Sequence, residues 1–134
     1  GAWFGMLSFE NEPLEKSIFI SPILDMKQLI SNMMLRANVS ETQLERERTI
    51  PTSSGQTLSW EYLLYAHEHP ITKWKVPTEI LYGGQDELTD RSVVEEFVQR
   101  FYCNLTVMED GEHWFHTPEQ LDILDTWTET CLQK

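Results

Sequence analysis

The sequence predicts an α/β fold in which parallel strands alternate with helices. Two apolar runs, at residues 80–86 and 105–113, have the pattern of buried strands, and each ends in a glycine-containing turn that carries ionisable residues. A segment with helical periodicity lies between them. Two parallel strands need a crossover connection, which is usually a helix, so this order predicts a strand, a crossover helix and a second strand in one parallel unit.

The polar residues in the two turns predict a functional site. Asp86 follows the first run and His113 follows the second. In open parallel sheets, functional groups lie just past the carboxyl ends of the strands. Neighbouring strands are about 4.8 Å apart. We therefore expect the carboxylate of Asp86 to reach the imidazole of His113.

The composition narrows the class of protein and its partners. The 134 residues are enough for one domain with a real core, and a hydrophobic fraction of 40% argues against disorder. The net charge of −12 argues against nucleic acid or an anionic membrane as a partner, because phosphates need a basic surface. No apolar run approaches about 18 residues, and no segment resembles a signal peptide. We expect Cys103 and Cys131 to be free thiols in a cytoplasmic protein, with a disulfide as the alternative.

The first elements are a helix and a strand. Residues 1–9 are apolar and small and predict a buried helix packed on the sheet, although no N-cap residue precedes it. Residues 16–20 predict a short strand. Pro22 ends this strand, because Ser21, as the residue before a proline, avoids helical angles.

A long segment separates this strand from the next one. Asp25 can cap a helix over residues 25–37, and residues 58–67 predict a second amphipathic helix. Between them, residues 38–48 are polar and charge-rich without a predicted element, and residues 49–56 predict a loop. The whole segment of about 50 residues is far longer than an ordinary connection.

Two further helices have recognisable starts. Ser92 and Glu95 have the spacing of a capping box, and the apolar stripe that follows consists of Val93, Val94, Phe97, Val98 and Phe101. Thr117, Pro118 and Gln120 supply an N-cap, a proline at the first helical position and a glutamine at the third. The buried face predicted for this last helix contains Leu121, Leu124, Trp127 and Cys131.

This order of elements resembles the second half of an α/β-hydrolase, with the match concentrated in residues 83–89 and 111–119. That family arranges its catalytic residues in the chain order serine, acid, histidine. Asp86 matches the acid and His113 the histidine. The resemblance implies that Asp86 orients His113 and that His113 acts as general base and acid on an ester or related acyl bond, without a cofactor.

Two other carboxylates are rivals for the acid position. Glu87 directly follows Asp86 and is the weaker of the two candidates for the role. Asp90 is better explained by its place near the start of the following helix, where negative charge is favourable.

The nucleophile expected from the resemblance is missing. No Gly-x-Ser-x-Gly motif occurs, and four serines lack the strand, elbow and helix context that a nucleophile needs. They are Ser8, Ser21, Ser53 and Ser54. Gly1 resembles the last glycine of the motif, so the resemblance implies a nucleophile two residues before it and a chain that is the C-terminal part of a longer hydrolase. The alternative is an ordinary buried helix at a natural N-terminus. Since the oxyanion hole would also lie upstream, we expect the chain alone to be inactive.

The long segment occupies the position where the family inserts a cap. We expect a single domain over residues 1–134, with residues 23–74 as a cap or lid that covers the acyl pocket. The candidates for lining this pocket are Met33, Met34, Trp60, Tyr62, Tyr65 and Trp114. Packing within the fold is the alternative role for the cap residues. We also expect Trp114 and Phe115 to pack the loop that presents His113.

Other functions remain open. A non-catalytic α/β binding module would use the Asp86–His113 pair only structurally, and a thioesterase or acyltransferase would share the same residues. The histidine pairs at residues 67–69 and 113–116 lack a zinc motif, so we expect no metal and no cofactor, and a small acyl compound as the substrate. An exposed sheet edge would promote self-association.

Overall fold

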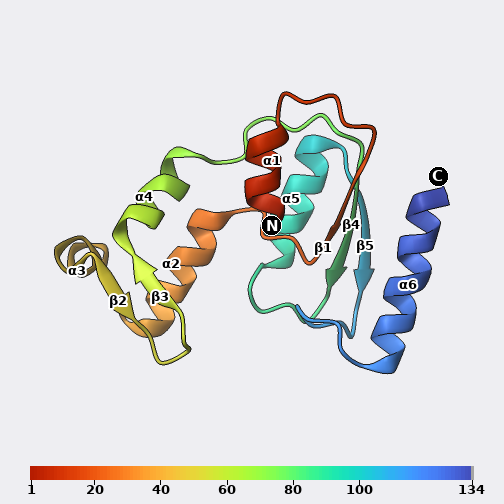
Figure 1. Ribbon diagram of the computed structural model, residues 1–134. Coiled ribbons are helices and arrows are strands. Elements are labelled where there is room, and N and C mark those ends of the chain that lie inside the picture. Colours follow the sequence, from red (N-terminus) through yellow and green to blue (C-terminus); the bar gives the residue numbers. More distant parts are fainter. Residues whose placement is uncertain (134) are drawn as a thin grey trace. The chain divides into compact units, whose positions relative to one another are not determined.

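The computed structural model describes residues 1–133, which form two compact units (Figure 1). The sheet unit consists of Gly1–Leu24 and residues 72–133, and the insert unit is Asp25–Ile71. The sequence analysis places the insertion at residues 23–74. Within the described residues, no helix combines the length and apolar character that a membrane span requires.

The sheet unit contains three parallel strands. They are β1 (Ser17–Ile20), β4 (Thr78–Gly83) and β5 (Asn104–Met108), in the spatial order β1-β4-β5. All six residues of β4 are buried, as expected for a central strand covered on both faces. Because both pairings are parallel, the carboxyl ends of all three strands lie at one edge of the sheet (Figure 1).

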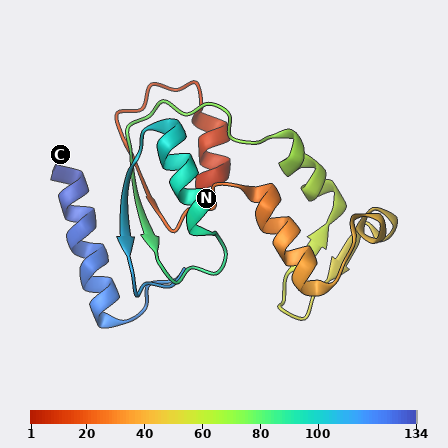
Figure 2. The same ribbon diagram turned by 180° about the vertical axis from the view of Figure 1, so that it is seen from behind.

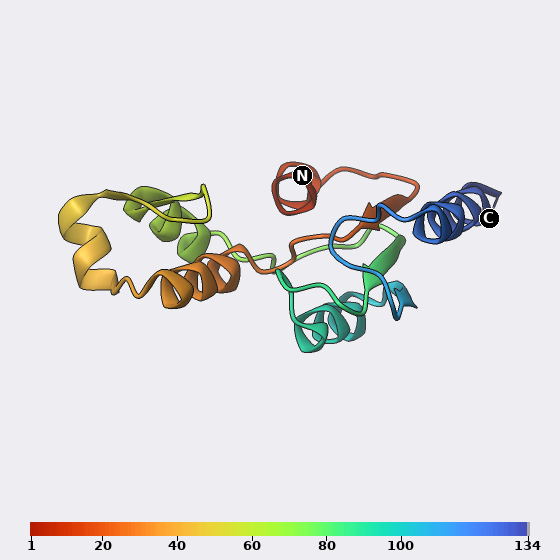
Figure 3. The same cartoon turned by 90° about the horizontal axis from the view of Figure 1, so that it is seen from below.

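Helices cover both faces of this sheet. The helices α1 (Ala2–Phe9) and α5 (Arg91–Phe101) lie on one side, and α6 (Pro118–Gln133) lies on the other (Figure 3). Trp3 and Met6 bury one side of α1, whereas two aromatic residues of this helix, Phe4 and Phe9, are exposed. The predicted α/β class, with parallel strands flanked by helices, is confirmed.

The face beneath α6 holds a core cluster that reaches the histidine loop. Its buried members are Leu81, Met108, Trp127 and Cys131, and Ile18, Phe115 and Leu124 pack against them. Phe115 belongs to the loop between β5 and α6, so its packing against the core cluster holds this loop in place. Cys103 and Cys131 are both buried, and no disulfide bond joins them.

The start of α6 confirms one predicted capping box. The backbone N–H of Gln120 donates to Thr117 Oγ1 at 3.1 Å, and the N–H of Thr117 donates to Gln120 Oε1 at 3.4 Å. These reciprocal bonds satisfy donors that the first turn of a helix leaves open.

The capping box predicted at Ser92 is wrong. α5 begins at Arg91, so its N-cap residue is Asp90, and Ser92 lies inside the first turn. The carboxylate of Glu95 accepts a hydrogen bond from Arg91 Nε at 3.1 Å and therefore does not reach back to cap the helix.

The insert unit contains more regular structure than the sequence predicts. Its elements are α2 (Met26–Ala37), α3 (Glu41–Glu47), β2 (Thr49–Pro51), β3 (Thr57–Ser59) and α4 (Trp60–Glu68). Asp25 caps α2 as predicted, because its Oδ1 accepts from the N–H of Gln28 at 3.0 Å.

Three predictions in this unit are wrong. Residues 38–48 contain α3, which Ser40 caps by accepting from the N–H of Gln43 at 3.1 Å. The expected loop at residues 49–56 includes β2, which pairs with β3 in an antiparallel hairpin, drawn in yellow in Figures 1 and 2. Since β3 extends to Ser59, which then caps α4, this helix starts at Trp60 and not at residue 58.

The C-cap of α5 gives a first prediction. Tyr102 has a left-handed backbone with φ of 55° and a side chain that is 92% exposed. Tyr102→Gly is expected to raise the free energy of unfolding by about 0.5–1 kcal/mol, because glycine adopts this conformation without a Cβ clash. Urea denaturation of the isolated chain measures the change. Tyr102→Ala keeps the Cβ atom and serves as the control, and an equal gain in both variants would contradict this explanation.

Candidate active site

The carboxylate of Asp86 is held in one orientation by the turn after β4. Its Oδ1 accepts hydrogen bonds from the backbone N–H groups of Leu88 at 2.8 Å and Thr89 at 3.2 Å. The hydroxyl of Tyr82 donates to the carbonyl of Thr89 at 2.7 Å and closes the turn from the strand side. Burial, followed by the charge of Asp86, raises the pKa of Tyr82, so this hydroxyl remains a donor. Two N–H groups directed at one oxygen fix the orientation of the carboxylate.

The second oxygen of Asp86 meets His113. Asp86 Oδ2 lies 2.8 Å from Nδ1 of His113, and the two side chains are 1% and 19% exposed. The contact expected from the sequence is therefore present. Because a carboxylate only accepts hydrogen bonds, Nδ1 carries the proton and donates it. The neutral imidazole then has its lone pair on Nε2.

Backbone hydrogen bonds join the two loops that carry this pair. The N–H of Gly84 donates to the carbonyl of Met108, and the N–H of Gln85 donates to the carbonyl of Gly111, both at 2.8 Å. A Cβ atom at Gly83 would lie 2.5 Å from the carbonyl oxygens of Gly111 and Glu112. Only glycine permits this close approach of the loops.

Gly83→Ala is therefore expected to separate the loops. We predict a loss of about 1–3 kcal/mol in the free energy of unfolding, because the overlapping atoms are backbone and cannot rotate away. Urea denaturation of the isolated chain measures this loss. Gly5→Ala, where a Cβ would meet no atom within 4 Å, is the control and should be neutral or stabilising. Equal stability of the Gly83→Ala and Gly5→Ala proteins would show that the loops accommodate a Cβ atom at residue 83 without strain.

The remaining residues of the histidine loop differ in their roles. Phe115 packs on the core as expected, but Trp114 is 79% exposed, so its predicted packing is wrong. The indole instead lies edge-on to the ring of His113, with a centroid distance of 5.7 Å. His116 has its Nδ1 3.0 Å from the carbonyl of Trp114 and 3.1 Å from a carboxylate oxygen of Glu112, and both residues belong to the same loop.

The rival acids do not occupy the position of Asp86. Asp90 is the N-cap residue of α5, as its place in the sequence indicates. Glu87 is an exposed residue in the turn. The carboxylate that the structure places against an imidazole at this edge of the sheet is Asp86.

Ser21 has some of the structural features that a nucleophilic serine requires. It directly follows β1, has φ of 48°, and is buried with a hydroxyl that lacks a hydrogen-bond partner among the described residues. Pro22 follows it, and no helix begins until Met26, so the strand–elbow–helix context is incomplete. Of the other serines considered, Ser8 lies in α1, and Ser53 and Ser54 lie between β2 and β3.

Cysteine and metal chemistry have little support in the described residues. Burial raises the pKa of the Cys103 thiol to about 11, which leaves very little thiolate at neutral pH. In residues 1–133, no group of three or more histidine, cysteine, aspartate or glutamate side chains is arranged to hold a metal ion.

Most of the predicted substrate-contacting residues belong to the insert unit. Met33 lies in α2 and is half-buried, whereas Met34 in the same helix is buried. On α4, Trp60 and Tyr62 are half-buried, and Tyr65 stacks on His69 with a centroid distance of 4.0 Å. Trp114 belongs to the sheet unit, together with Asp86 and His113.

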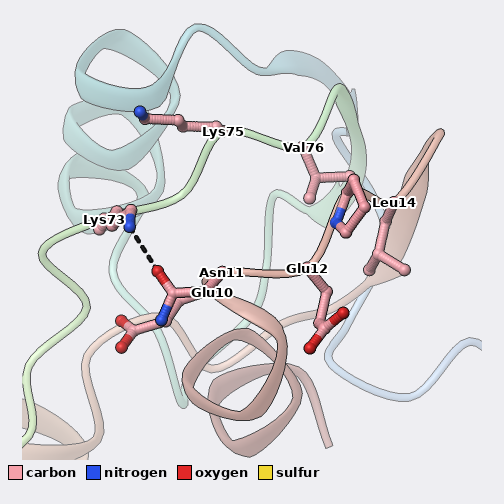
Figure 4. A pocket seen from close by; sticks show the side chains of 8 residues that line it. Glu10, Asn11, Glu12, Leu14, Lys73, Lys75 and Val76 are labelled. Carbon is pink, nitrogen blue, oxygen red and sulfur yellow. Dashed lines mark hydrogen bonds between the residues drawn. The ribbon is translucent and has the colours of Figure 1, made fainter.

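The sheet unit also has an open hollow of about 290 Å³ (Figure 4). Its charged lining residues are Glu10, Glu12, Lys73 and Lys75, and Lys73 donates a hydrogen bond to Asn11. Leu14 and Val76 in its wall precede β1 and β4, so the hollow adjoins the amino ends of these strands. Asp86 and His113 follow the carboxyl ends of their strands, so this hollow is separate from the candidate site.

The fold and the placement of this pair define the class of the chain. Parallel strands in the order β1-β4-β5, helices on both sides, an acid after the central strand and a histidine after the next one are the arrangement of part of an α/β-hydrolase fold.

Comparison with solved structures confirms this fold. The chain is similar to the mouse alpha/beta hydrolase domain-containing protein 10, with a TM-score of 0.72 and 14% identity over 98% of this chain and 57% of that one. It is also similar to Est1E from Butyrivibrio proteoclasticus, with a TM-score of 0.74 and 19% identity over 99% and 57%. Est1E with bound ferulic acid gives a TM-score of 0.70 and 18% identity over 99% and 55%.

Sequence comparisons add no closer relationship. No protein-family model matches the chain, and no curated protein matches it. The chain spans a little more than half the length of the structures that it resembles, namely 57% of the mouse protein and of Est1E. At identities below 20%, these similarities show the fold.

Proposed function

We propose that this chain is the C-terminal part of a serine hydrolase that cleaves an ester or a related acyl bond. The observation that carries the proposal is the 2.8 Å contact between Asp86 Oδ2 and His113 Nδ1, with the other carboxylate oxygen held by two backbone N–H groups. A catalytic triad requires a buried acid that fixes both the tautomer and the orientation of its histidine. Similar folds in hydrolase-named structures support the same class.

In the proposed mechanism, His113 moves the protons. With Nδ1 bonded to Asp86, Nε2 takes the proton from a serine hydroxyl as the oxygen attacks the acyl carbon. The buried carboxylate stabilises the imidazolium that forms. His113 then gives the proton to the leaving alcohol, which leaves an acyl-enzyme, and in the second half it activates the water that releases the acid.

The serine and the oxyanion hole complete this site. We assign them to the rest of the hydrolase fold, since the chain corresponds to 57% of the similar chains. Within residues 1–133, none of the four serines considered has the full context of a nucleophile. The complete hydrolase is therefore the active form in this proposal, and the isolated chain is expected to be inactive.

The proposed substrate is a small-molecule carboxylic ester. One of the similar structures, Est1E, holds ferulic acid, and a carboxylic acid of this kind is what ester hydrolysis releases. We propose that the insert unit acts as the cap over the acyl group, because the chain enters this unit just after β1, the strand that neighbours the strand of Asp86. Four of its predicted pocket residues are half-buried or exposed and supply apolar surface for such a group: Met33, Trp60, Tyr62 and Tyr65. Met34 is buried within the unit and supplies none.

Labelling and turnover of the complete hydrolase test this proposal. A fluorophosphonate probe should label one serine, and p-nitrophenyl acetate should be hydrolysed with a burst of acyl-enzyme. The isolated chain should show neither reaction. A folded complete protein that neither reacts with the probe nor cleaves the ester would instead favour a non-catalytic binding module. Preference for a thioester of the same acyl group would indicate a thioesterase.

A further inference from the structure

We propose that Gln120 is a positioning residue that holds the two ends of the histidine loop together. This loop comprises residues 109–117 and joins β5 to α6. The inference rests on the proposed function, because it concerns how His113 is presented to Asp86. It extends that proposal by assigning a role to a residue that contacts neither of them.

One buried amide binds both ends of the loop. Gln120 Nε2 donates to the carbonyl of Asp110 at 3.2 Å, at the start of the loop. Its Oε1 accepts from the N–H of His116 at 3.0 Å and from that of Thr117 at 3.4 Å, at the end of the loop. The side chain belongs to a residue that is only 8% exposed, so water competes weakly for these bonds.

Helix capping explains only part of this arrangement. A glutamine at the third helical position normally reaches back to the N-cap residue, which here is Thr117. The bond from Nε2 to Asp110 crosses the whole loop and contributes nothing to the start of the helix. It needs a side chain that donates and accepts at once, which glutamine has and glutamate lacks.

The bond to Asp110 also connects the histidine loop to the turn of Asp86. Asp110 precedes Gly111, whose carbonyl accepts the N–H of Gln85, the residue before Asp86. Gln120 therefore fixes the point at which the two loops meet. Without it, the start of the loop is free to shift relative to its end, and the distance between Asp86 and His113 changes. A misplacement of about 1 Å in a reacting group can lower a rate by about 10²-fold.

Three variants separate positioning from capping. Gln120→Met removes both functions. Gln120→Glu keeps the acceptor for the helix start but cannot donate to Asp110. Thr117→Val is the matched control, because it removes the side-chain acceptor of the cap and leaves the bond between Gln120 and Asp110 in place.

The first measurement is independent of catalysis. In the isolated chain, the Nδ1 proton of His113 should give a far-downfield NMR resonance, because it is bonded to a carboxylate. We expect Gln120→Glu to broaden or lose this resonance while its thermal midpoint stays near that of the wild type. We expect Thr117→Val to keep the resonance and to have a lower thermal midpoint. If Gln120→Glu keeps the wild-type resonance, Gln120 is only a helix cap and the proposal is wrong.

The second measurement uses the complete hydrolase with p-nitrophenyl acetate. Gln120→Glu and Gln120→Met should lower kcat by about 10- to 100-fold with little change in KM, whereas Thr117→Val should keep kcat. Wild-type kcat in both Gln120 variants would overturn the proposal. A hydrolase that shows the NMR changes but no ester hydrolysis in any form would instead overturn the proposed function and leave the role of Gln120 in the loop intact.

Discussion

Replacing His113 with alanine is expected to lower kcat of the complete hydrolase for p-nitrophenyl acetate by about 10⁴- to 10⁶-fold. Without the imidazole, no group takes the serine proton or returns it to the leaving alcohol. The Asp86 carboxylate also loses the partner of its Oδ2 atom at 2.8 Å. Initial rates over a range of ester concentrations would separate the effects on kcat and KM.

The histidine loop supplies a matched control for this experiment. His116 lies in the same loop and is exposed, and its imidazole ring makes its contacts within the loop. His116→Ala is expected to keep kcat within about 10-fold of wild type, because its ring is not bonded to Asp86. If His113→Ala retained wild-type activity, or if His116→Ala lost as much, the roles assigned to the two histidines would be wrong.

Replacing Asp86 with asparagine is expected to lower kcat by about 10⁴-fold, with the fold preserved. Asparagine has nearly the same shape, and its carbonyl oxygen can still accept the N–H groups of Leu88 and Thr89. Its NH₂ group then faces Nδ1, which must become the acceptor. The proton moves to Nε2, and the ring can no longer act as a base toward serine.

This second experiment also has a control within the same segment. Asp90 is the N-cap residue of α5, so Asp90→Asn keeps a good capping residue and should leave kcat near wild type. NMR of the imidazole nitrogens in the isolated chain would report the tautomer of His113 directly. A His113 that keeps its proton on Nδ1 in the Asp86→Asn protein would contradict the explanation, whatever the rate.

The sequence predicts the Asp86–His113 pair because each part of the pair follows from a local signal. An apolar run and a glycine turn locate each strand end, and the rules of parallel sheets bring the two ends together. The capping box at Thr117 and Gln120 is equally local. In contrast, the bond between Gln120 and Asp110 depends on the path of a loop, for which the sequence has no periodic signal.

The elements that the sequence analysis missed are short and polar. In α3, the buried residue is Leu44, so its hydrophobic pattern is too weak to distinguish it from a charged loop. The strands β2 and β3 have three residues each and are defined by their pairing with one another. The exposed position of Trp114 is also not predicted by the sequence. A large aromatic residue in a loop is usually expected to pack against neighbouring residues.

The direct backbone bonds between the turn of Asp86 and the loop of His113 have a mechanical consequence. These bonds oppose relative motion of the two segments, so we expect Asp86 and His113 to move together when this edge of the sheet is displaced. In the proposed hydrolase, the distance that is left to vary would be the one between His113 and the serine. The rate of such a molecule would depend on the distance between His113 and the serine, because the distance between Asp86 and His113 is already fixed.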